Sequence, residues 1–274
     1  MMFKRSFILR VLTTLVLVPL TLLLIWAPPL GAFYVLFITT LACIGTIEYF
    51  NLLRAKQIPA ETVAGIAAGT TVTISGMFGA PGLTALLVYG GILLVSAVHV
   101  ARVRLSLEGL AGSAFGVIYV GWFAAHMILL HELPVAGPGL VTILLVAVAV
   151  TDAFAYLGGS AFGRHKLAPR VSPAKTWEGA AAGFLLTLCA MAVVYAISRR
   201  TGGWPDWTLA RYVWVGALLS VVAQIGDLAE SSMKRSAGVK DSGALFPGHG
   251  GVLDRCDGFL FAAPALYYVA ANLF

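Results

Sequence analysis

Four side chains that can bind a proton, a metal ion or a phosphate follow one another at helical spacing in an apolar part of the chain. They stand at positions i, i+3, i+4 and i+7, and they are Asp227, Glu230, Ser231 and Lys234. A helix would present all four on one face. An ionisable group among membrane-spanning residues is costly, so such a face indicates a functional site. For Asp227 alone, a structural ion pair or a helix-packing hydrogen bond is the alternative.

Two further acids, Asp254 and Asp257, stand three residues apart where the last helix is expected to begin. Asp often caps the start of a helix, and capping is the alternative role for this pair. If two helix ends bring Asp227 and Asp254 together, their carboxylates suit Mg²⁺, which usually shares its coordination with substrate phosphates. We therefore predict Asp227 and Asp254 as ligands of one or two metal ions, with Asp257 and Glu230 as weaker candidates.

Basic residues accompany these acids and could neutralise phosphate charge. The members of this basic set are Lys175, Lys234, Arg235, Lys240 and Arg255. Glycines are interleaved with the acids and bases at positions 243, 248, 250 and 251. A glycine lets the backbone approach a ligand closely and present N–H groups to an anion. His249, between two of these glycines, is either a functional group or a turn residue.

A second polar segment runs from Asp152 to Gly179 and contains Ser172, Lys175, Thr176 and Glu178. The glycine spacing from Gly158 to Gly163 is that of a phosphate loop, but Arg164-His165 follows where Lys-Ser/Thr is required. The sequence contains no G-x-S-x-G elbow, so it does not indicate serine-hydrolase chemistry.

The composition places these segments in a membrane protein. Of the 274 residues, 59% are hydrophobic and only 11% are charged, whereas a soluble domain carries about 25% charged residues. The net charge of +6 need not indicate nucleic acid, because Lys and Arg collect in cytoplasmic loops. No zinc-finger spacing or aromatic-interleaved basic patch is present, so we expect no nucleic-acid partner. The three scattered cysteines form no CxxC pair, which argues against a zinc site or a disulfide framework.

We predict an all-α polytopic protein of about nine transmembrane helices. Two uncharged runs, Val11–Ile47 and Thr62–Ala101, each divide into two helices, at Pro28-Pro29 and near Gly79–Gly82. The second helix ends in the polar residues Glu48, Asn51, Arg54 and Lys56. Five single spans follow at Gly109–Leu130, Gly139–Leu157, Gly179–Ile197, Tyr212–Met233 and Gly258–Phe274. Each approaches the roughly 20 residues that cross a bilayer. The run Val11–Ala27 is long for a signal peptide, so it is expected to be retained.

The positive-inside rule orients these spans. With a cytoplasmic amino terminus, all of the 18 basic residues except Arg199, Arg200 and Arg211 fall inside. Residues 1–108 then form four amino-terminal spans, and residues 109–274 form five catalytic spans with cytoplasmic polar segments 152–179 and 227–257. We expect a bacterial inner (plasma) membrane. A lipid-exposed bundle of this size could form a homodimer.

The stretch from Ser231 to Asp257 resembles the signature of the phosphatidate cytidylyltransferases, also called CDP-diacylglycerol synthases. The matching residues are Ser231, Met233, Lys234, Arg235, Lys240, Asp241, Gly243, Phe246, Pro247, His249, Gly250, Gly251, Val252, Asp254, Arg255 and Asp257. The segment 152–179 resembles the other polar block of that family. Cys256 departs from the pattern, since an aliphatic residue or Thr is usual there. The resemblance covers roughly the carboxyl-terminal half, and the first four spans match only in general character.

The resemblance implies transfer of CMP from CTP to phosphatidic acid with Mg²⁺, giving CDP-diacylglycerol and pyrophosphate at the cytoplasmic side of the membrane. Together with the residue chemistry, it assigns catalytic roles to Asp227, Asp254, Lys234, Arg235, Arg255 and Asp257. The expected substrate-binding residues are Asp152, Ser172, Lys175, Thr176, Glu178, Ser231, Lys240, Asp241, His249, Gly250 and Gly251. A CTP-dependent lipid kinase is one alternative. A transporter is another, although a transport path would carry polar groups through the full membrane depth.

The acids of both polar segments fall at the same end of their expected helices. Asp152 ends one helix, Glu178 begins the next, Asp227 lies near the end of the eighth and Asp254 begins the ninth. Because these helices alternate in direction, we expect the four acids to line one cavity, open to the cytoplasm for CTP and sideways to lipid for phosphatidic acid. The alternative is that Asp152 and Glu178 only cap or pin their own helices.

Overall fold

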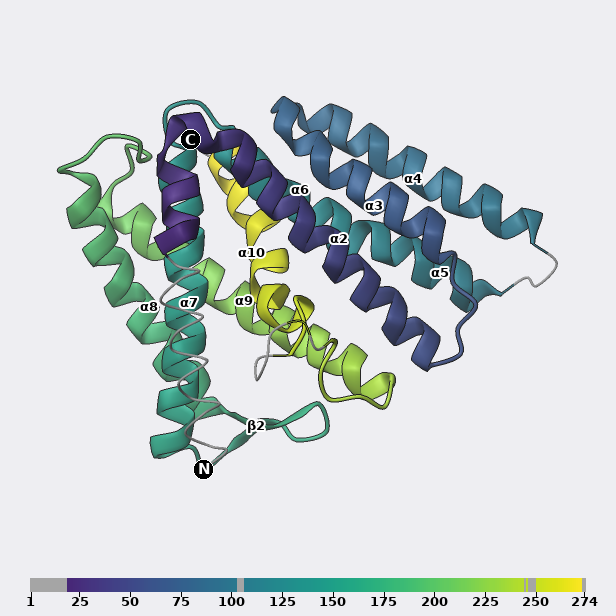
Figure 1. Cartoon of the computed structure of the whole chain (residues 1–274). Coiled ribbons are helices and arrows are strands. Elements are labelled where there is room, and N and C mark those ends of the chain that lie inside the picture. Colours follow the sequence, from purple (N-terminus) through teal and green to yellow (C-terminus); the bar gives the residue numbers. More distant parts are fainter. Residues whose placement is uncertain (1–18, 103–105, 244, 246–249, 273–274) are drawn as a thin grey trace. The chain divides into compact units, whose positions relative to one another are not determined.

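The computed structural model describes residues 19–102, 106–243, 245 and 250–272, and these residues are mostly helical (Figure 1). The chain divides into two compact units. Unit 1 comprises Met1–Glu132 and Ser236–Cys256, and unit 2 comprises Leu133–Arg235 and Asp257–Phe274. The predicted all-α class is confirmed for the described residues, apart from one short antiparallel hairpin of β1 (Lys166–Ala168) and β2 (Ser172–Thr176).

Unit 1 is a bundle whose central helix is short. Its elements are η1 (Pro28–Leu30), α2 (Gly31–Ala55), α3 (Thr62–Ser75), η2 (Gly76–Phe78), α4 (Pro81–Ala101), α5 (Leu107–Gly116), η3 (Val117–Trp122) and α6 (Phe123–His131). The last three form one continuous rod with a π-helical middle, η3. In Figure 1, α3 lies between α2 and α4, and it contacts both of them and η3. Pro81 occupies the first turn of α4. An N–H group at this position would have no acceptor within the helix, so a proline costs no helical hydrogen bond there.

Two glycines bring α3 and the π-helical segment η3 into backbone contact. A Cβ atom at Gly121 would lie 2.7 Å from the Gly69 Cα atom and 2.8 Å from the Gly69 carbonyl oxygen. The buried Thr73 hydroxyl group reaches the same contact, 3.1 Å from the Gly121 carbonyl oxygen. Small residues that let helix backbones approach are a common packing device in membrane proteins.

A buried acid outside the predicted site ties three chain segments of unit 1 together. Glu61, just before α3, lies 3.1 Å through Oε1 from the His99 Nδ1 atom and 2.9 Å through Oε2 from the Arg102 Nε atom. The other ring nitrogen of His99 accepts a hydrogen bond from the Ser106 N–H group at 3.1 Å. These contacts join the start of α3 to the end of α4 and the N-cap of α5.

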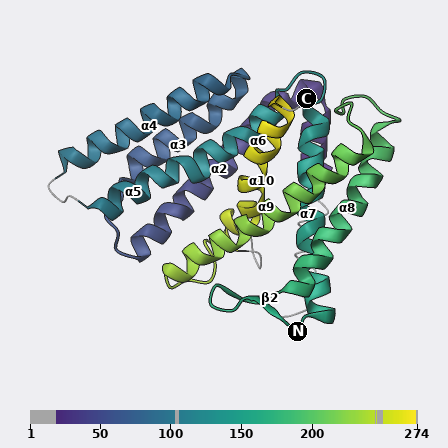
Figure 2. The ribbon, with the colours of Figure 1, turned by 180° about the vertical axis from the view of Figure 1, so that it is seen from behind.

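Unit 2 is built on a close pair of helices, α7 (Gly137–Phe162) and α8 (Trp177–Ser198), which lie side by side in Figure 2. A Cβ atom at Gly179 would lie 2.5 Å from the Ala155 carbonyl oxygen, and one at Gly183 would lie 2.6 Å from that of Thr151. Glycines four residues apart therefore let α8 pack directly on the α7 backbone. The unit also contains α9 (Leu209–Ser236), except for its last residue, and α10 (Leu253–Asn272) from Asp257 onward.

Three hydroxyl groups form hydrogen bonds between α7, α8 and α9 in the apolar core of unit 2. The Thr151 Oγ1 atom of α7 lies 2.8 Å from the Thr187 Oγ1 atom of α8 and 2.9 Å from the Ser220 Oγ atom of α9. All three side chains are fully buried. Hydrogen bonds of this kind satisfy polar groups between membrane-spanning helices.

Six helices of the described chain are long and apolar enough to cross a membrane. They are Gly31–Ala55, Pro81–Ala101, Leu107–His131, Gly137–Phe162, Trp177–Ser198 and Leu209–Ser236. Each corresponds to a predicted span and extends beyond its predicted bounds at one end or both, since the polar flanking residues are also helical. The apolar helix Thr62–Phe78 is shorter, and α10 begins with charged residues. Residues 11–18 of the run 11–27 lie outside the described residues. The count of nine spans and the cytoplasmic amino terminus stay predictions.

The chain returns to unit 1 after α9, so the polar segment 227–257 contributes residues to both units. The polar segment 152–179 belongs to unit 2 alone. The predicted functional division at residue 108 is a different kind of boundary, and it stays a prediction.

The contact between Gly69 and Gly121 gives a test of the packing in unit 1. The change Gly121→Ala should lower stability by about 1–3 kcal/mol, because the new methyl group overlaps the α3 backbone. The measurement is the thermal unfolding midpoint of the detergent-solubilised protein. Gly90→Ala is the matched control, since a Cβ atom there meets nothing within 4 Å. Equal midpoints for the two variants would contradict the packing described.

Candidate active site

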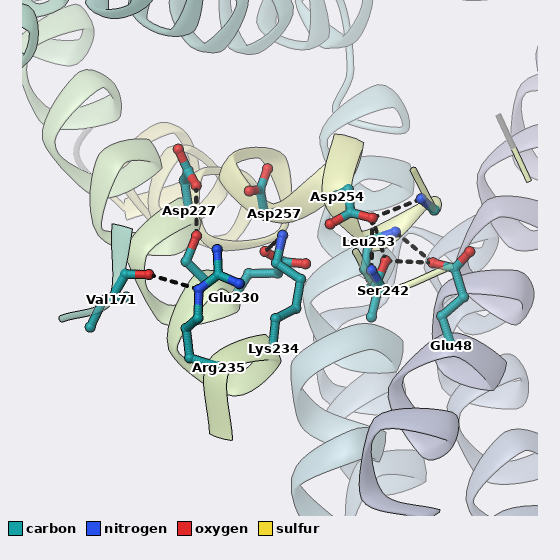
Figure 3. A network of polar contacts seen from close by, with 12 residues as sticks. Glu48, Val171, Asp227, Glu230, Lys234, Arg235, Ser242, Leu253, Asp254 and Asp257 are labelled. Carbon is teal, nitrogen blue, oxygen red and sulfur yellow. Dashed lines mark hydrogen bonds and ion pairs between the residues drawn. The ribbon is translucent and has the colours of Figure 1, made fainter. Parts of the chain in front are cut away.

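Acids from three helices of unit 2 act on one another. Asp257, in the first turns of α10, is buried, and its carboxylate interacts electrostatically with those of Asp227, Glu230 and Asp152. Asp227 and Glu230 belong to α9 (Figure 3). Asp152 belongs to α7. Like charges held near one another repel, so this group requires compensating positive charge.

Two lysines supply part of that charge. The Lys175 ammonium group of β2 forms an ion pair with the Asp227 carboxylate. Lys234 lies one turn after Glu230 on α9, with its Nζ atom 2.6 Å from the Glu230 Oε2 atom (Figure 3). Glu230 is 0% exposed, so removing its partner would leave an uncompensated buried charge. The Ser231 hydroxyl group donates a longer hydrogen bond to Asp227, at 3.5 Å. The four residues predicted to share one face of a helix all lie on α9.

The hairpin of β1 and β2 carries three of the predicted substrate-binding residues, Ser172, Lys175 and Thr176. Besides the ion pair of Lys175, it is held by Arg235, whose Nε atom donates a hydrogen bond to the Val171 carbonyl oxygen at 3.3 Å. Both contacts come from α9. The hairpin was not predicted, because its strands are too short for a clear alternating pattern.

Two predicted substrate-binding residues already serve the start of α8. The Thr176 Oγ1 atom accepts a hydrogen bond from the Gly179 N–H group at 3.2 Å and so caps the helix. The Glu178 carboxylate accepts hydrogen bonds from the Arg164 and His165 N–H groups at 3.1 and 3.2 Å, and lies 2.6 Å from the His165 Nδ1 atom. For Glu178 the observed contacts are those of the alternative role, in which it pins its own helix.

In unit 1 the loop before α10 wraps around the Asp254 carboxylate. Asp254 Oδ2 accepts hydrogen bonds from the Ser242 N–H and hydroxyl groups, both at 2.9 Å, and from the Gly251 N–H group at 2.7 Å. Gly250 has a φ angle of +83°, and a Cβ atom there would lie 2.5 Å from the same oxygen. The glycines of this loop therefore allow its backbone to approach a carboxylate of the chain itself.

A second carboxylate, from another helix, binds this loop and was not predicted as a site residue. Glu48 of α2 is 5% exposed. Its Oε1 atom accepts a hydrogen bond from the Val252 N–H group at 3.0 Å, and its Oε2 atom accepts one from the Leu253 N–H group at 2.9 Å (Figure 3). The sequence indicated only the end of a span here. A usable signal was that Glu48 lies three residues after Gly45 and four before Leu52, on the face of α2 that is buried.

The remaining predicted residues fall into two groups. Lys240, Asp241 and Arg255 are exposed residues of unit 1. His249 lies outside the described residues. Asp227 and Asp254 belong to different units, so their convergence on one ion and the single cavity for all four acids stay predictions.

The donor chemistry suits magnesium. Within the described part of the chain, no group of three or more His, Cys, Asp or Glu side chains is arranged to hold a metal ion. Mg²⁺ does not require such a cage, because one or two carboxylates together with substrate phosphates and water complete its coordination. Carboxylate oxygens such as those of Asp227 and Asp257 are the hard donors that it takes.

Comparison with known proteins identifies close similarity over nearly the whole chain. A family model described as the cytidylyltransferase family matches residues 8–273. The phosphatidate cytidylyltransferase of Brucella abortus is 37% identical over 262 residues, which cover 96% of this chain and 92% of that protein. The Bacillus subtilis protein of the same name is 29% identical over 83% of this chain and 86% of its own length. A chloroplastic phosphatidate cytidylyltransferase of Arabidopsis thaliana is 34% identical over 80% of this chain and 61% of its own length.

The ion pair between Lys175 and Asp227 predicts how firmly the hairpin is held. The change Asp227→Asn should weaken the attachment of β2 by about 1 kcal/mol and raise the population of the released hairpin about fivefold. Trypsin should then cut faster after Arg170, which is exposed in the turn between β1 and β2. Asp206→Asn, which breaks the exposed pair of Asp206 with Arg199, is the matched control. An unchanged cleavage rate at Arg170 would contradict the role of the ion pair.

Proposed function

The chain belongs to the cytidylyltransferase family, and from this premise we propose that it transfers CMP from CTP to phosphatidic acid, giving CDP-diacylglycerol and pyrophosphate. Relatives named for this activity in two bacteria and a chloroplast support the proposal. In the structure, the observation that carries it is the group of acids around Asp257 together with the lysines on Asp227 and Glu230. Such a group of paired charges is what two phosphate-bearing substrates and a divalent cation require.

The first task of the site is to let two anions approach. Lys175, Lys234, Arg235 and Arg255 are proposed to bind the phosphates of CTP and phosphatidic acid. Asp227 can pair either with Lys175 or with a cation, so cation binding would free the Lys175 ammonium group for a phosphate. Arg255 can hold a phosphate through two parallel hydrogen bonds, which a lysine cannot do.

We assign Mg²⁺, as one ion or two, to Asp227 and Asp254, with Asp257 and Glu230 as weaker candidates. When bound, Mg²⁺ would offset the negative charge that develops on the reacting phosphates. The side chains contribute by holding the substrates in line and by supplying fixed charge, which is most of what phosphoryl-transfer enzymes do.

The transfer itself needs no nucleophile from the protein. A phosphate oxygen of phosphatidic acid attacks the α-phosphorus of CTP and forms the new P–O bond. The bond from the α-phosphorus to the bridging oxygen breaks, and pyrophosphate leaves with the electron pair. A phosphate monoester is already ionised at neutral pH, so no dedicated general base is required.

The substrates also fix where the reaction takes place. CTP is soluble in water and phosphatidic acid is held in the bilayer, so the site should lie where cytoplasm meets lipid. We propose an integral protein of the plasma membrane, with nine spans and its amino terminus and active site on the cytoplasmic side. The six apolar helices support a polytopic arrangement. Formation of a homodimer stays a prediction.

Product identity tests the reaction. The purified protein in lipid–detergent micelles should convert labelled CTP and phosphatidic acid into CDP-diacylglycerol and pyrophosphate in equal amounts, as read by mass spectrometry. Release of CDP from CTP with a phosphorylated lipid alcohol would instead identify a CTP-dependent lipid kinase. If neither CDP-diacylglycerol nor CDP forms from CTP in micelles that contain phosphatidic acid, the proposed enzymatic role on this lipid is contradicted.

The metal assignment predicts the effect of two isosteric substitutions. Asp227→Asn and Asp254→Asn should each lower turnover at least about 100-fold, because each removes a charge that the cation needs while keeping the side-chain shape. Turnover should be measured at saturating CTP over a magnesium titration, with Asp206→Asn as the control. Near-normal turnover of Asp254→Asn at saturating magnesium would remove Asp254 from the proposed ligands.

A further inference from the structure

We propose that Glu48 is a positioning residue that fixes the loop before α10 and so places Asp254 for the reaction. Glu48 lies on α2, while its partners lie in residues 242–253 of the same unit (Figure 3). The inference rests on the proposed function for the role of Asp254, whereas the contact that fixes the loop is independent of it.

The hydrogen bonds of Glu48 explain how one side chain can hold this loop. Both carboxylate oxygens are engaged, with the Val252 N–H group at 3.0 Å on Oε1 and the Leu253 N–H group at 2.9 Å on Oε2. These N–H groups lie at the start of α10, where a helix has no internal acceptors for them and favours negative charge. Glu48 therefore supplies from another helix the acceptor that a capping residue normally supplies locally.

Ser242 links Glu48 to Asp254. Its hydroxyl oxygen lies 3.1 Å from the Glu48 Oε2 atom and 2.9 Å from the Asp254 Oδ2 atom. A hydroxyl group has a single proton, so the two carboxylates share one donor. A displacement of Glu48 therefore changes the hydrogen bonding of Asp254 directly, through one intervening atom.

Two glycines show that the space around Glu48 is filled. A Cβ atom at Gly243 would overlap Glu48 Oε1, and one at Gly251 would overlap both Glu48 Oε2 and the Ser242 hydroxyl oxygen. The loop backbone thus closes on the carboxylate from two sides. Because Glu48 is also buried, its role is to order the chain around it, and direct contact with substrate is left to Asp254.

The experiment separates loop order from catalysis by using two readouts. Hydrogen–deuterium exchange of the full chain in detergent should show faster exchange at Gly251, Val252 and Leu253 in Glu48→Gln than in the unaltered protein. The amide of Gln retains one acceptor oxygen and replaces the other with a donor that faces N–H groups. Glu108→Gln, the same change at an exposed acid in unit 1, is the control and should leave exchange and activity unchanged.

Kinetics then test positioning. Glu48→Gln should lower turnover about 10- to 100-fold and raise the magnesium concentration for half-maximal rate, as loss of a supporting residue around a metal ligand does. The Michaelis constant for CTP should change less than turnover. Ser242→Ala removes the shared donor without changing charge. It should also lower turnover and raise the magnesium concentration for half-maximal rate, and it replaces Glu48→Gln as the test variant if Glu48→Gln does not fold.

The outcomes are distinguishable. Unchanged exchange in Glu48→Gln would overturn the proposed hold on the loop. Faster exchange with unaltered turnover and magnesium requirement would make Glu48 a packing residue only and would also overturn the proposal. If the unaltered protein forms no CDP-diacylglycerol, the proposed function fails, while the exchange measurement still decides whether Glu48 orders the loop.

Discussion

A carboxylate among apolar helices requires a partner for its charge, because burial without one is far more costly than any single packing contact is favourable. Three buried acids of the described residues meet that requirement in different ways. Glu48 accepts hydrogen bonds from backbone N–H groups. Glu61 pairs with His99 and Arg102, and Glu230 forms an ion pair with Lys234. The partners of Glu48 and Glu61 come from other segments of unit 1, so these two acids also fix which segments lie together. Lys234 lies on the same helix as Glu230 and stabilises it locally.

The same chemistry connects structure and function in unit 2. Asp227, Glu230 and Asp152 act on the buried Asp257, and lysines pair with two of these acids, Asp227 and Glu230. Under the proposed function, a cation bound by Asp227 would take the place of the Lys175 ammonium group in its ion pair. The hairpin would take part in that exchange because Lys175 lies on β2. The side chains that hold the hairpin are thus the same ones that the proposal assigns to catalysis.

Much of this could be predicted from the sequence, and the reasons for the misses are physical. Long uncharged runs predicted the positions of the helices, since a helix needs about 20 apolar residues to cross a bilayer. The spacing of Asp227 and Lys234 correctly placed both on one helix. The bounds were less accurate because helices continue into polar flanks, as α2 does past Glu48. The partners of Glu48 are 194 to 205 residues away, and no local pattern reveals such a contact.

The glycines show a similar limit. Those from Gly158 to Gly163 have the spacing of a phosphate loop, which the following residues ruled out. The structure shows that Gly179 and Gly183, for which no role was predicted, allow α8 to lie against the backbone of α7. Those around residue 250 were interpreted as places where the backbone approaches a ligand and presents N–H groups to an anion, and for a ligand this stays a prediction. The anions observed there are Glu48 and Asp254 of the chain itself. Glycines in a sequence motif indicate that the backbone comes close to another group, but they do not identify that group.

The distance along the chain between Glu48 and its partners has a consequence for biosynthesis. Ribosomes add about 5–20 residues per second, so the N–H groups of Val252 and Leu253, 204 and 205 residues downstream, follow Glu48 after about 10–40 s. During that interval α2 enters the membrane with an acid whose final partners have not been made. The early helices of unit 1 must therefore exist for a time without these hydrogen bonds. Synthesis of residues 236–256 is then the event that completes unit 1.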